Sequence, residues 1–314
     1  SDLAAPMTNE HGRADQGVAA MILAKIYLNA EVYINQNKYD ECVVELNKLI
    51  NGGYSLSPDY LLNFMADNDN NAAKSEIIFP LISDGTYTQN YGPTTVMING
   101  SVGSIEANGA EVGVGAGGWG GALRLRKQFV NLFNDGVFNT DTRNTIISEN
   151  RNIDITDISD KDQGYILQKY SNALSSGGYG ADQTFVDTDF PLFRLADAYL
   201  MYAEAYLRGA TNTTEANALD YVNRIRTRAN NPQSINSADL TLDFILDERS
   251  RELHWEAHRR QDLIRFNKFT GGTYNWVWKG NGSNGISLPS HLKLYPIPAA
   301  SLATNPNLTQ NTGY

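Results

Sequence analysis

The chain has 314 residues, of which 41% are hydrophobic and 19% charged, as is typical of a folded globular protein. Its formal charge of −10 excludes a protein that grips nucleic-acid phosphates regardless of sequence. The one cysteine, Cys42, excludes an intrachain disulfide, and its helical surroundings predict a buried thiol. No apolar run reaches the roughly 18 residues that a membrane-spanning helix needs.

Two helical hairpins are predicted from apolar residues that recur at three- and four-residue spacing. The first spans about residues 16–51 and the second about 193–230. The segments Ala24-Lys25-Ile26-Tyr27-Leu28 and Ala196-Asp197-Ala198-Tyr199-Leu200 are similar and predict equivalent helices in the two hairpins. Such pairs resemble tetratricopeptide repeats, of which about three are needed for independent stability. We therefore expect the two hairpins to pack on further repeats or on another part of the protein.

The sequence between the hairpins differs from them in composition and in its apolar pattern. Residues 76–81 are apolar but contain a proline, which predicts at best an edge strand. Residues 84–121 are rich in Gly, Thr, Asn and Tyr without helical periodicity, and a loop of this length is usually functional or disordered. Further helices are predicted at about 122–133 and, with many charges, at about 242–266. The predicted fold is mainly α, with tetratricopeptide-like hairpins packed against a loop-rich, irregular region in a single unit of residues 1–314.

Several phrases occur in an order typical of one family. The segment from Asp189 to Leu200, DFPLFRLADAYL, is one, and the charged helix with Glu248-Arg249 and Arg259-Arg260 is another, although Ala257 stands where glycine is usual. The ending, from Tyr295-Pro296-Ile297-Pro298 to Gly313-Tyr314, is a third. Together they resemble the SusD/RagB family of outer-membrane glycan-binding lipoproteins. Since family members are longer, the resemblance implies a C-terminal part, with the lipid-bearing cysteine and first repeats before Ser1.

The resemblance implies a function without catalysis. Members bind oligo- or polysaccharides at the extracellular face of the outer membrane and deliver them to a SusC-like TonB-dependent transporter. The chain is most similar to the starch-binding founder of the family, because Asn90-Tyr91-Gly92 and Gly118-Trp119 stand where that protein places sugar-binding aromatic residues. An α-glucan is therefore the expected ligand, and a lipid anchor outside this chain the expected attachment.

Tyr91 and Trp119 are the predicted glycan-stacking residues, with Asn90 as a polar partner. Both rings lie in glycine-rich segments outside any periodic apolar face, where a ring can stand exposed and stack on a sugar. The alternative is that each ring only fixes its own loop. Trp276 and Trp278 flank Val277 at strand spacing, and this predicts core packing instead.

Two short motifs lack the surrounding sequence that their usual functions require. Residues 113–118 satisfy GxGxxG, but the polar segment before them is not the buried strand that a dinucleotide site requires. His254 and His258 lie four residues apart with Glu256 between them, which is not the HExxH order of a zinc protease. We interpret the charged helix as a structural brace with pairs such as Glu248–Arg251 and Glu256–Arg260.

No cofactor is predicted to be required, but a structural Ca²⁺ is compatible with the acidic triplets 67–69 and 187–189. If the two loops meet, Asp69, Asp187 and Asp189 would share one ion, with Glu76 as a further ligand. Two other function classes stay open at this point. One is a helical-repeat interaction module that binds a protein and no glycan, and the other is a glycoside hydrolase, for which no particular carboxylate pair stands out.

Overall fold

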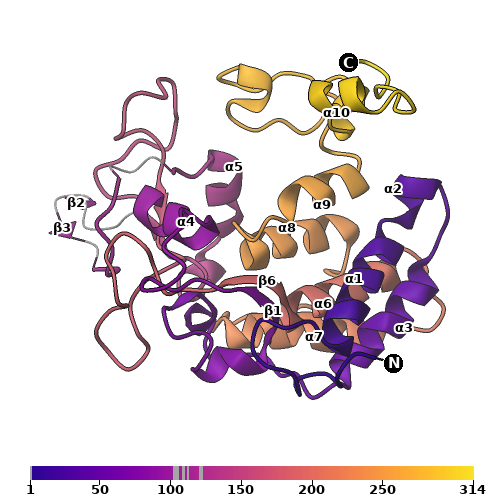
Figure 1. Ribbon diagram of the computed structural model, residues 1–314, viewed down its shortest axis with the longest axis horizontal. Helices are drawn as coiled ribbons and strands as arrows, with labels where there is room; N and C mark the ends of the chain where they lie inside the picture. The colour runs from indigo at the N-terminus through magenta and orange to yellow at the C-terminus, as the bar shows by residue number, and fades with distance from the viewer. Residues whose placement is uncertain (1, 102–105, 108–109, 112, 120–122) are drawn as a thin grey trace. The chain divides into compact units, whose positions relative to one another are not determined.

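The computed structural model describes residues 2–101, 106–107, 110–111, 113–119 and 123–314 (Figure 1). Residues 1–257 and 258–314 form two compact units. Helices account for most of the regular structure, and the strands are few and short, which confirms the mainly α fold. No helix in these ranges is long and apolar enough to cross a membrane.

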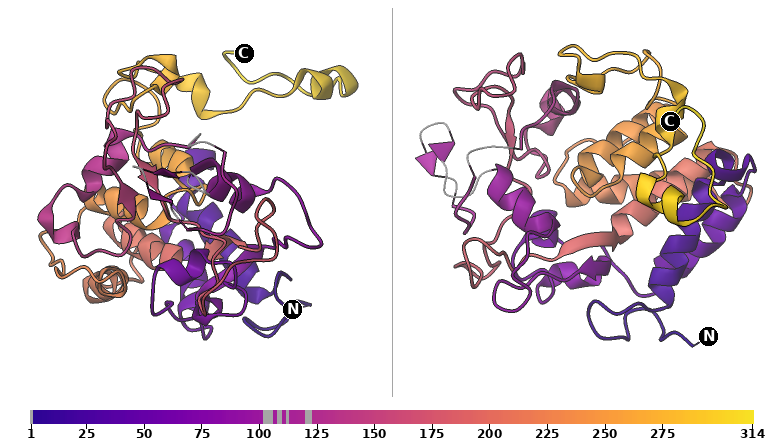
Figure 2. Two further views of the ribbon diagram at one scale, coloured as in Figure 1. Left: turned by 90° about the vertical axis from the view of Figure 1, so that its left-hand side faces the viewer. Right: turned by 45° about the horizontal axis from the view of Figure 1, so that its top comes forward.

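Both predicted hairpins are present in the first unit. The first consists of α1 (Gln16–Leu28) and α3 (Tyr39–Ile50), with the short α2 (Ala30–Ile34) between them. Asp15 caps α1 by accepting a hydrogen bond from the Val18 amide at 3.1 Å. The second consists of α6 (Leu195–Leu207) and α7 (Glu215–Arg228), and Thr214 caps α7. α3 packs against α6, so the two hairpins lie side by side, indigo beside salmon in Figure 2.

A two-stranded antiparallel sheet lies next to the hairpins. β1 (Ile77–Leu81) is the predicted edge strand, and it pairs with β6 (Phe190–Arg194), which runs directly into α6. Pro80 lies opposite Pro191, so two positions of the ladder lack an amide donor. The other strands have two residues each: β2 (Glu106–Ala107), β3 (Ala110–Glu111), β4 (Ile146–Ile147) and β5 (Ile166–Leu167).

Three predicted elements differ from the structure. The segment 84–121, expected to be irregular, contains α4 (Pro93–Ser101), whose first residue is a proline that fits the first helical turn. The helix expected at 122–133 shortens to α5 (Lys127–Val130) followed by a 3₁₀ turn. The helix expected at 242–266 ends early, as α8 (Leu242–Leu253).

α8 ends where side chains bind carbonyl groups between residues 252 and 255. Lys169 Nζ donates to the carbonyl oxygens of Glu252 (3.4 Å) and His254 (2.6 Å), and Tyr170 donates to that of Trp255 (3.2 Å). Trp255 and Ala257 then adopt left-handed conformations with φ of 60° and 66°, which a continuous helix cannot include. Residue periodicity cannot reveal this break because the donors come from a segment more than 80 positions away.

The charged face of α8 is buried rather than solvated. Arg194 Nη1 lies 2.6 Å from Glu252 and 2.8 Å from Glu76, and its Nε lies 2.6 Å from Glu256. Arg143 pairs with Asp141, Glu248 and Glu252, while Arg228 pairs with Glu76 and Glu252. The predicted Glu248–Arg251 pair is present at 2.8 Å. The brace predicted from the sequence therefore exists, but as an ionic network in the interior.

Two clusters of buried apolar side chains can be defined among the described residues outside the hairpins. The larger of the two includes residues of the segment 60–64, of α4 and of β6, and the smaller includes residues of α5. Cys42 is buried in α3, as predicted. The larger cluster consists of Tyr60, Phe64, Ile98, Val114, Ala116, Ile166, Tyr170, Val186 and Phe190, and the smaller of Leu125, Phe129, Val130, Phe133, Phe138 and Leu167.

The second unit contains α9 (Arg259–Arg265), α10 (Ala299–Thr304) and much extended chain. Trp276 packs against Phe269 with ring centroids 6.0 Å apart and ring planes inclined by 33°, and Val277 is buried between two half-buried tryptophans. Trp278 has φ of 65°, so this segment is a turn and not the strand that the spacing indicated.

Glu252→Gln tests the ionic network. The substitution removes a buried carboxylate that neutralises Arg143, Arg194 and Arg228, so we expect the free energy of unfolding to fall by about 3–5 kcal/mol. Asp220→Asn is the matched control, because it breaks an exposed Asp220–Arg224 pair of 2.8 Å and should cost less than about 1 kcal/mol. Urea unfolding measures both, and equal losses would contradict a buried network.

The network also predicts acid sensitivity. Neighbouring guanidinium groups lower the pKa of Glu248 to about 2 against the opposing effect of burial, and they lower the pKa of Glu252 further. The unfolded chain therefore takes up protons that the folded chain does not as the pH falls below about 4.5. We expect the free energy of unfolding to decline from there as the pH falls towards 2. Urea titrations across this range would show it, and a flat profile would argue against the assignment.

Candidate functional site

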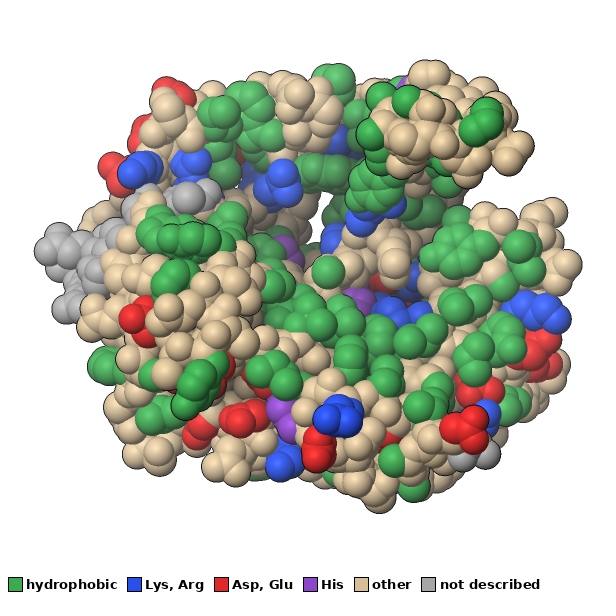
Figure 3. All heavy atoms as spheres, in the orientation of Figure 1, with side chains coloured by type: hydrophobic (Ala, Val, Ile, Leu, Met, Phe, Trp, Pro, Cys, Tyr) green, Lys and Arg blue, Asp and Glu red, His purple; other side chains and the backbone are tan. Residues whose placement is uncertain are grey.

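Three rings from distant parts of the chain meet at the surface near α4. Tyr91 and Trp119 have ring centroids 5.9 Å apart, and Tyr91 and Phe185 have centroids 5.4 Å apart, both pairs inclined by 55°. Tyr91 is 67% exposed and Trp119 40% exposed, although aromatic rings normally bury most of their surface. We call these three residues the aromatic platform. Hydrophobic side chains are visible at the surface over the α4 region in Figure 3.

Tyr91 is held between a turn and a helix. Asp84 Oδ1 accepts from the Thr86 and Tyr87 amides at 2.7 Å each, which forms the turn that precedes it. Immediately after Tyr91, the Gly92 carbonyl accepts from Val96 and joins the segment to α4. The predicted polar partner Asn90 is exposed beside Tyr91. Its amide is thus available to a ligand that lies on the ring.

Trp119 stands at the end of a loop that depends on glycine. Gly115 and Gly118 have φ of 69° and 78°, in the left-handed region that other residues rarely adopt. The Tyr179 ring covers Gly115 so closely that a Cβ there would lie 2.4 Å from it. The glycines of the GxGxxG pattern therefore serve loop geometry, and the described part of the preceding segment consists of β2 and β3, two antiparallel strands of two residues each.

Phe185 was not predicted from the sequence. It is half-buried behind Tyr91, in a turn where Asp182 Oδ1 accepts from the Thr184 and Phe185 amides at 2.7 and 2.8 Å. The available signal was Phe185 itself, an aromatic residue directly after the polar stretch from Gly180 to Thr184. The predicted pair Tyr91 and Trp119 does lie together on one surface, and Phe185 completes the cluster.

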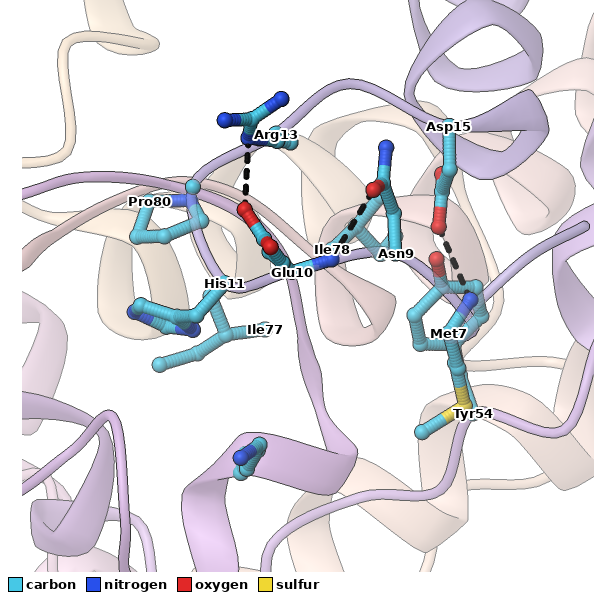
Figure 4. Close-up of a pocket in the computed structure, with 12 residues that line it drawn as sticks. Met7, Asn9, Glu10, His11, Arg13, Asp15, Tyr54, Ile77, Ile78 and Pro80 are labelled. Carbon is cyan, nitrogen blue, oxygen red and sulfur yellow. Dashed lines mark hydrogen bonds and ion pairs between the residues drawn. The ribbon is translucent and has the colours of Figure 1, made fainter. Parts of the chain in front are cut away.

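A separate pocket of about 250 Å³ lies between the first residues and β1 (Figure 4). Three of its charged side chains already have partners: Arg13 Nε lies 2.8 Å from Glu10, and Asp15 accepts from the Met7 amide at 2.8 Å. Its one aromatic residue, Tyr54, is 7% exposed and offers no open ring face. The pocket is better suited to holding the N-terminal segment against β1 than to binding a sugar.

The four predicted calcium ligands do not come together. Glu76 accepts from Arg194 and Arg228 in the buried network, so it is removed from the candidate set. Asp187 accepts from the Gly85 and Ala181 amides at 2.6 and 2.7 Å. Within the described ranges, no three His, Cys, Asp or Glu side chains are grouped so that they could hold a metal ion.

The corner around Asp189 is the part of the predicted calcium set that stays close. Asp189 bonds His11 Nε2 at 2.6 Å and the Ser83 amide at 2.8 Å. Burial and the negative charge of Asp189 both raise the pKa of Asp69. Calcium binding by Asp69, Asp187 and Asp189 stays a prediction, and the existing partners of the last two carboxylates do not favour it.

The sequence model of the SusD family matches residues 126–314, more than half of the chain. The chain belongs to the SusD family. It is 33% identical to the starch-binding protein SusD of Bacteroides thetaiotaomicron over all of this chain and 63% of that protein. It is 29% identical to the SusD-like protein P25 of Formosa agariphila, over 97% of this chain and 60% of P25. The chain thus spans about three-fifths of the length of these relatives.

Solved structures share the SusD-family fold. A SusD superfamily protein from Parabacteroides distasonis matches with a TM-score of 0.68 at 22% identity, over 100% of this chain and 66% of that chain. Surface glycan-binding protein A from Bacteroides thetaiotaomicron, in complex with laminarihexaose, matches with a TM-score of 0.67 at 22% identity, over 98% of this chain and 66% of that one. At this level of identity the likeness establishes the fold.

Gly115→Ala tests the loop that carries Trp119 in this SusD-family chain. The left-handed backbone alone should cost about 1–2 kcal/mol, and the collision with Tyr179 about 1–3 kcal/mol more. Gly177→Ala is the control, because its φ is also positive and a Cβ there would meet nothing within 4 Å. Chemical denaturation of both variants measures the difference. Equal losses would mean that Tyr179 does not pack on Gly115.

Proposed function

We propose that this protein binds oligo- or polysaccharide at the cell surface and that the aromatic platform contacts the sugar. The observation that carries the proposal is the meeting of Tyr91 and Trp119 on one exposed surface, from segments 28 residues apart along the chain. The C–H face of a pyranose stacks on such rings, and its hydroxyl groups take amide partners such as Asn90. No reaction is part of this proposal: the platform binds a glycan and leaves its bonds intact.

The preferred ligand is an α-glucan of the starch type. The rings are inclined by 55°, so they match a chain whose successive sugars turn, and not a flat ribbon with coplanar faces. A β-1,3-glucan chain also turns, and a laminarihexaose complex exists for a structural neighbour of 22% identity. The relative with 33% identity over the whole chain is named for starch binding, and this favours the α-glucan.

Delivery of the glycan to a SusC-like TonB-dependent transporter is the second part of the proposal. It rests on family membership and places the full-length protein at the extracellular face of the outer membrane, held by a lipid anchor outside residues 1–314. A protein that hands its ligand on needs a binding surface that releases it. An exposed platform with few polar contacts meets this requirement because each stacked ring contributes only modestly to affinity.

A helical-repeat module that binds a protein partner is the second candidate. Ile22, Ile26 and Tyr33 favour it, because these side chains of the first hairpin are 44%, 48% and 58% exposed. This candidate predicts that the full-length protein migrates normally in gels that contain any glycan. The aromatic platform lies beside α4 and these side chains lie on α1 and α2, so variants of the two sets would discriminate between glycan binding and partner binding.

Replacement of the exposed rings tests the proposed function. In affinity electrophoresis of the full-length protein, we expect starch or pullulan to retard the wild type more than laminarin does. Tyr91→Ala with Trp119→Ala should remove the retardation, since each stacked ring contributes about 1 kcal/mol or more beyond its buried area. Tyr33→Ala is the control, because it removes from α2 a ring whose 58% exposure lies between those of Trp119 and Tyr91.

Retained binding in the double variant, with an unchanged melting temperature, would refute the platform as the glycan site. Stronger retardation by laminarin would keep the site and change the ligand. Release of new reducing ends from labelled maltooligosaccharides would instead identify a glycoside hydrolase. We expect none.

A further inference from the structure

The three rings of the aromatic platform come from three segments, and these segments meet at one buried side chain. Asn99 lies on α4, near the end opposite to Tyr91, and is 1% exposed. Its Oδ1 accepts from the Gly118 amide at 2.9 Å, and its backbone carbonyl accepts from the Trp119 amide at 2.6 Å. Its Nδ2 donates to the Thr184 carbonyl at 3.0 Å, next to Phe185.

The same amide is also fixed to its own helix. Asn99 Nδ2 donates to the Thr95 carbonyl at 3.1 Å, and this leaves the side chain one orientation in which every polar group is used. Thr95 Oγ1 in turn accepts from the Val186 amide at 3.3 Å, so α4 holds the segment around Phe185 at two points. α4 therefore links Tyr91 at its start to Trp119 and Phe185 at its end.

The link that the Asn99 side chain forms between these segments depends on both its amide donor and its amide acceptor. The Gly118 amide and the Thr184 carbonyl lie in irregular segments, where no helix or sheet ladder supplies a substitute partner. Loss of the Asn99 amide, which is 1% exposed, leaves the Gly118 amide and the Thr184 carbonyl without the partner that holds their segments to α4. The segments would then separate or shift to find other partners.

We propose that Asn99 is a positioning residue for glycan binding: it sets the relative placement of Tyr91, Trp119 and Phe185 without touching the sugar. This inference rests on the proposed function and deepens it, because it makes affinity depend on a buried amide behind the platform. A glycan that spans two rings requires both at the correct separation and tilt. Rings that are present but misplaced bind it weakly.

Two substitutions separate the roles of the amide. Asn99→Asp keeps the acceptor for Gly118 but replaces the donor to Thr184 and Thr95 with a second acceptor, and thus loosens the Phe185 side. Asn99→Ala removes both sides. We expect each to weaken binding of a maltooligosaccharide by the full-length protein about five- to tenfold, as for the loss of one buried hydrogen bond or more. Trp119→Ala should weaken it further, because Asn99→Ala leaves the backbone bond to Trp119 in place.

Asn68→Ala is the matched control. Asn68 is 0% exposed, and its Nδ2 likewise donates to two carbonyls, those of Asn63 (2.8 Å) and Asp189 (2.9 Å). Its Oδ1 likewise accepts one backbone amide, that of Asp189 at 3.2 Å. Both alanine variants should lower the melting temperature to a similar extent, but only Asn99→Ala should lower the affinity.

Isothermal titration calorimetry with the maltooligosaccharide, below the melting temperature of every variant, measures the affinities. Wild-type affinity in both Asn99 variants, together with lost binding in Trp119→Ala, would overturn the inference and leave the proposed function intact. An equal loss of affinity in Asn68→Ala would overturn it too, because it would show a general structural effect. No binding by the wild type would overturn the proposed function itself.

Discussion

The buried guanidinium of Arg194 is the constraint on which the first unit depends. It stands at the end of β6 and bonds Glu76 before β1, Glu252 in α8 and Glu256 beyond α8. A charge in the interior is tolerable only when partners surround it, so these segments cannot move apart without exposing an unpaired ion. One side chain thereby fixes the sheet, the second hairpin and the end of α8 against one another.

The network extends from this centre to both hairpins. Arg228 of α7 reaches Glu76 and Glu252, and Arg249 of α8 shares Asp197 of α6 with Lys25 of α1. Two hairpins alone are too few for a free-standing repeat array. Here they are joined to the irregular region by charges as well as by apolar packing, which explains how they fold with that region as one unit.

The platform lies on the irregular side of this scaffold, where buried side-chain amides rather than regular structure join the segments. Asn99, near the end of α4, joins the Gly-rich loop before Trp119 to the turn before Phe185. Asn172 Nδ2 donates to the carbonyls of Gly115 and Asp182. A buried asparagine can satisfy two carbonyls and one amide at once, so it substitutes for a sheet ladder between loops. The exposed rings are thereby held in place although no helix or strand carries them.

The sequence by itself determined what depends on neighbours along the chain. The 3.6-residue periodicity placed both hairpins, Gly-rich segments marked the loops that display Tyr91 and Trp119, and ordered phrases indicated the family. Only the tertiary structure decided what depends on distant partners. Lys169 binds a carbonyl group just after the end of α8, where the sequence predicted a continuous helix. Glu76 pairs with Arg194 and Arg228 in the interior instead of joining the predicted calcium ligands. Phe185 packs against Tyr91 in the platform. The physical reason is that a carboxylate, a carbonyl or a ring looks the same in the sequence whichever partner the fold brings to it.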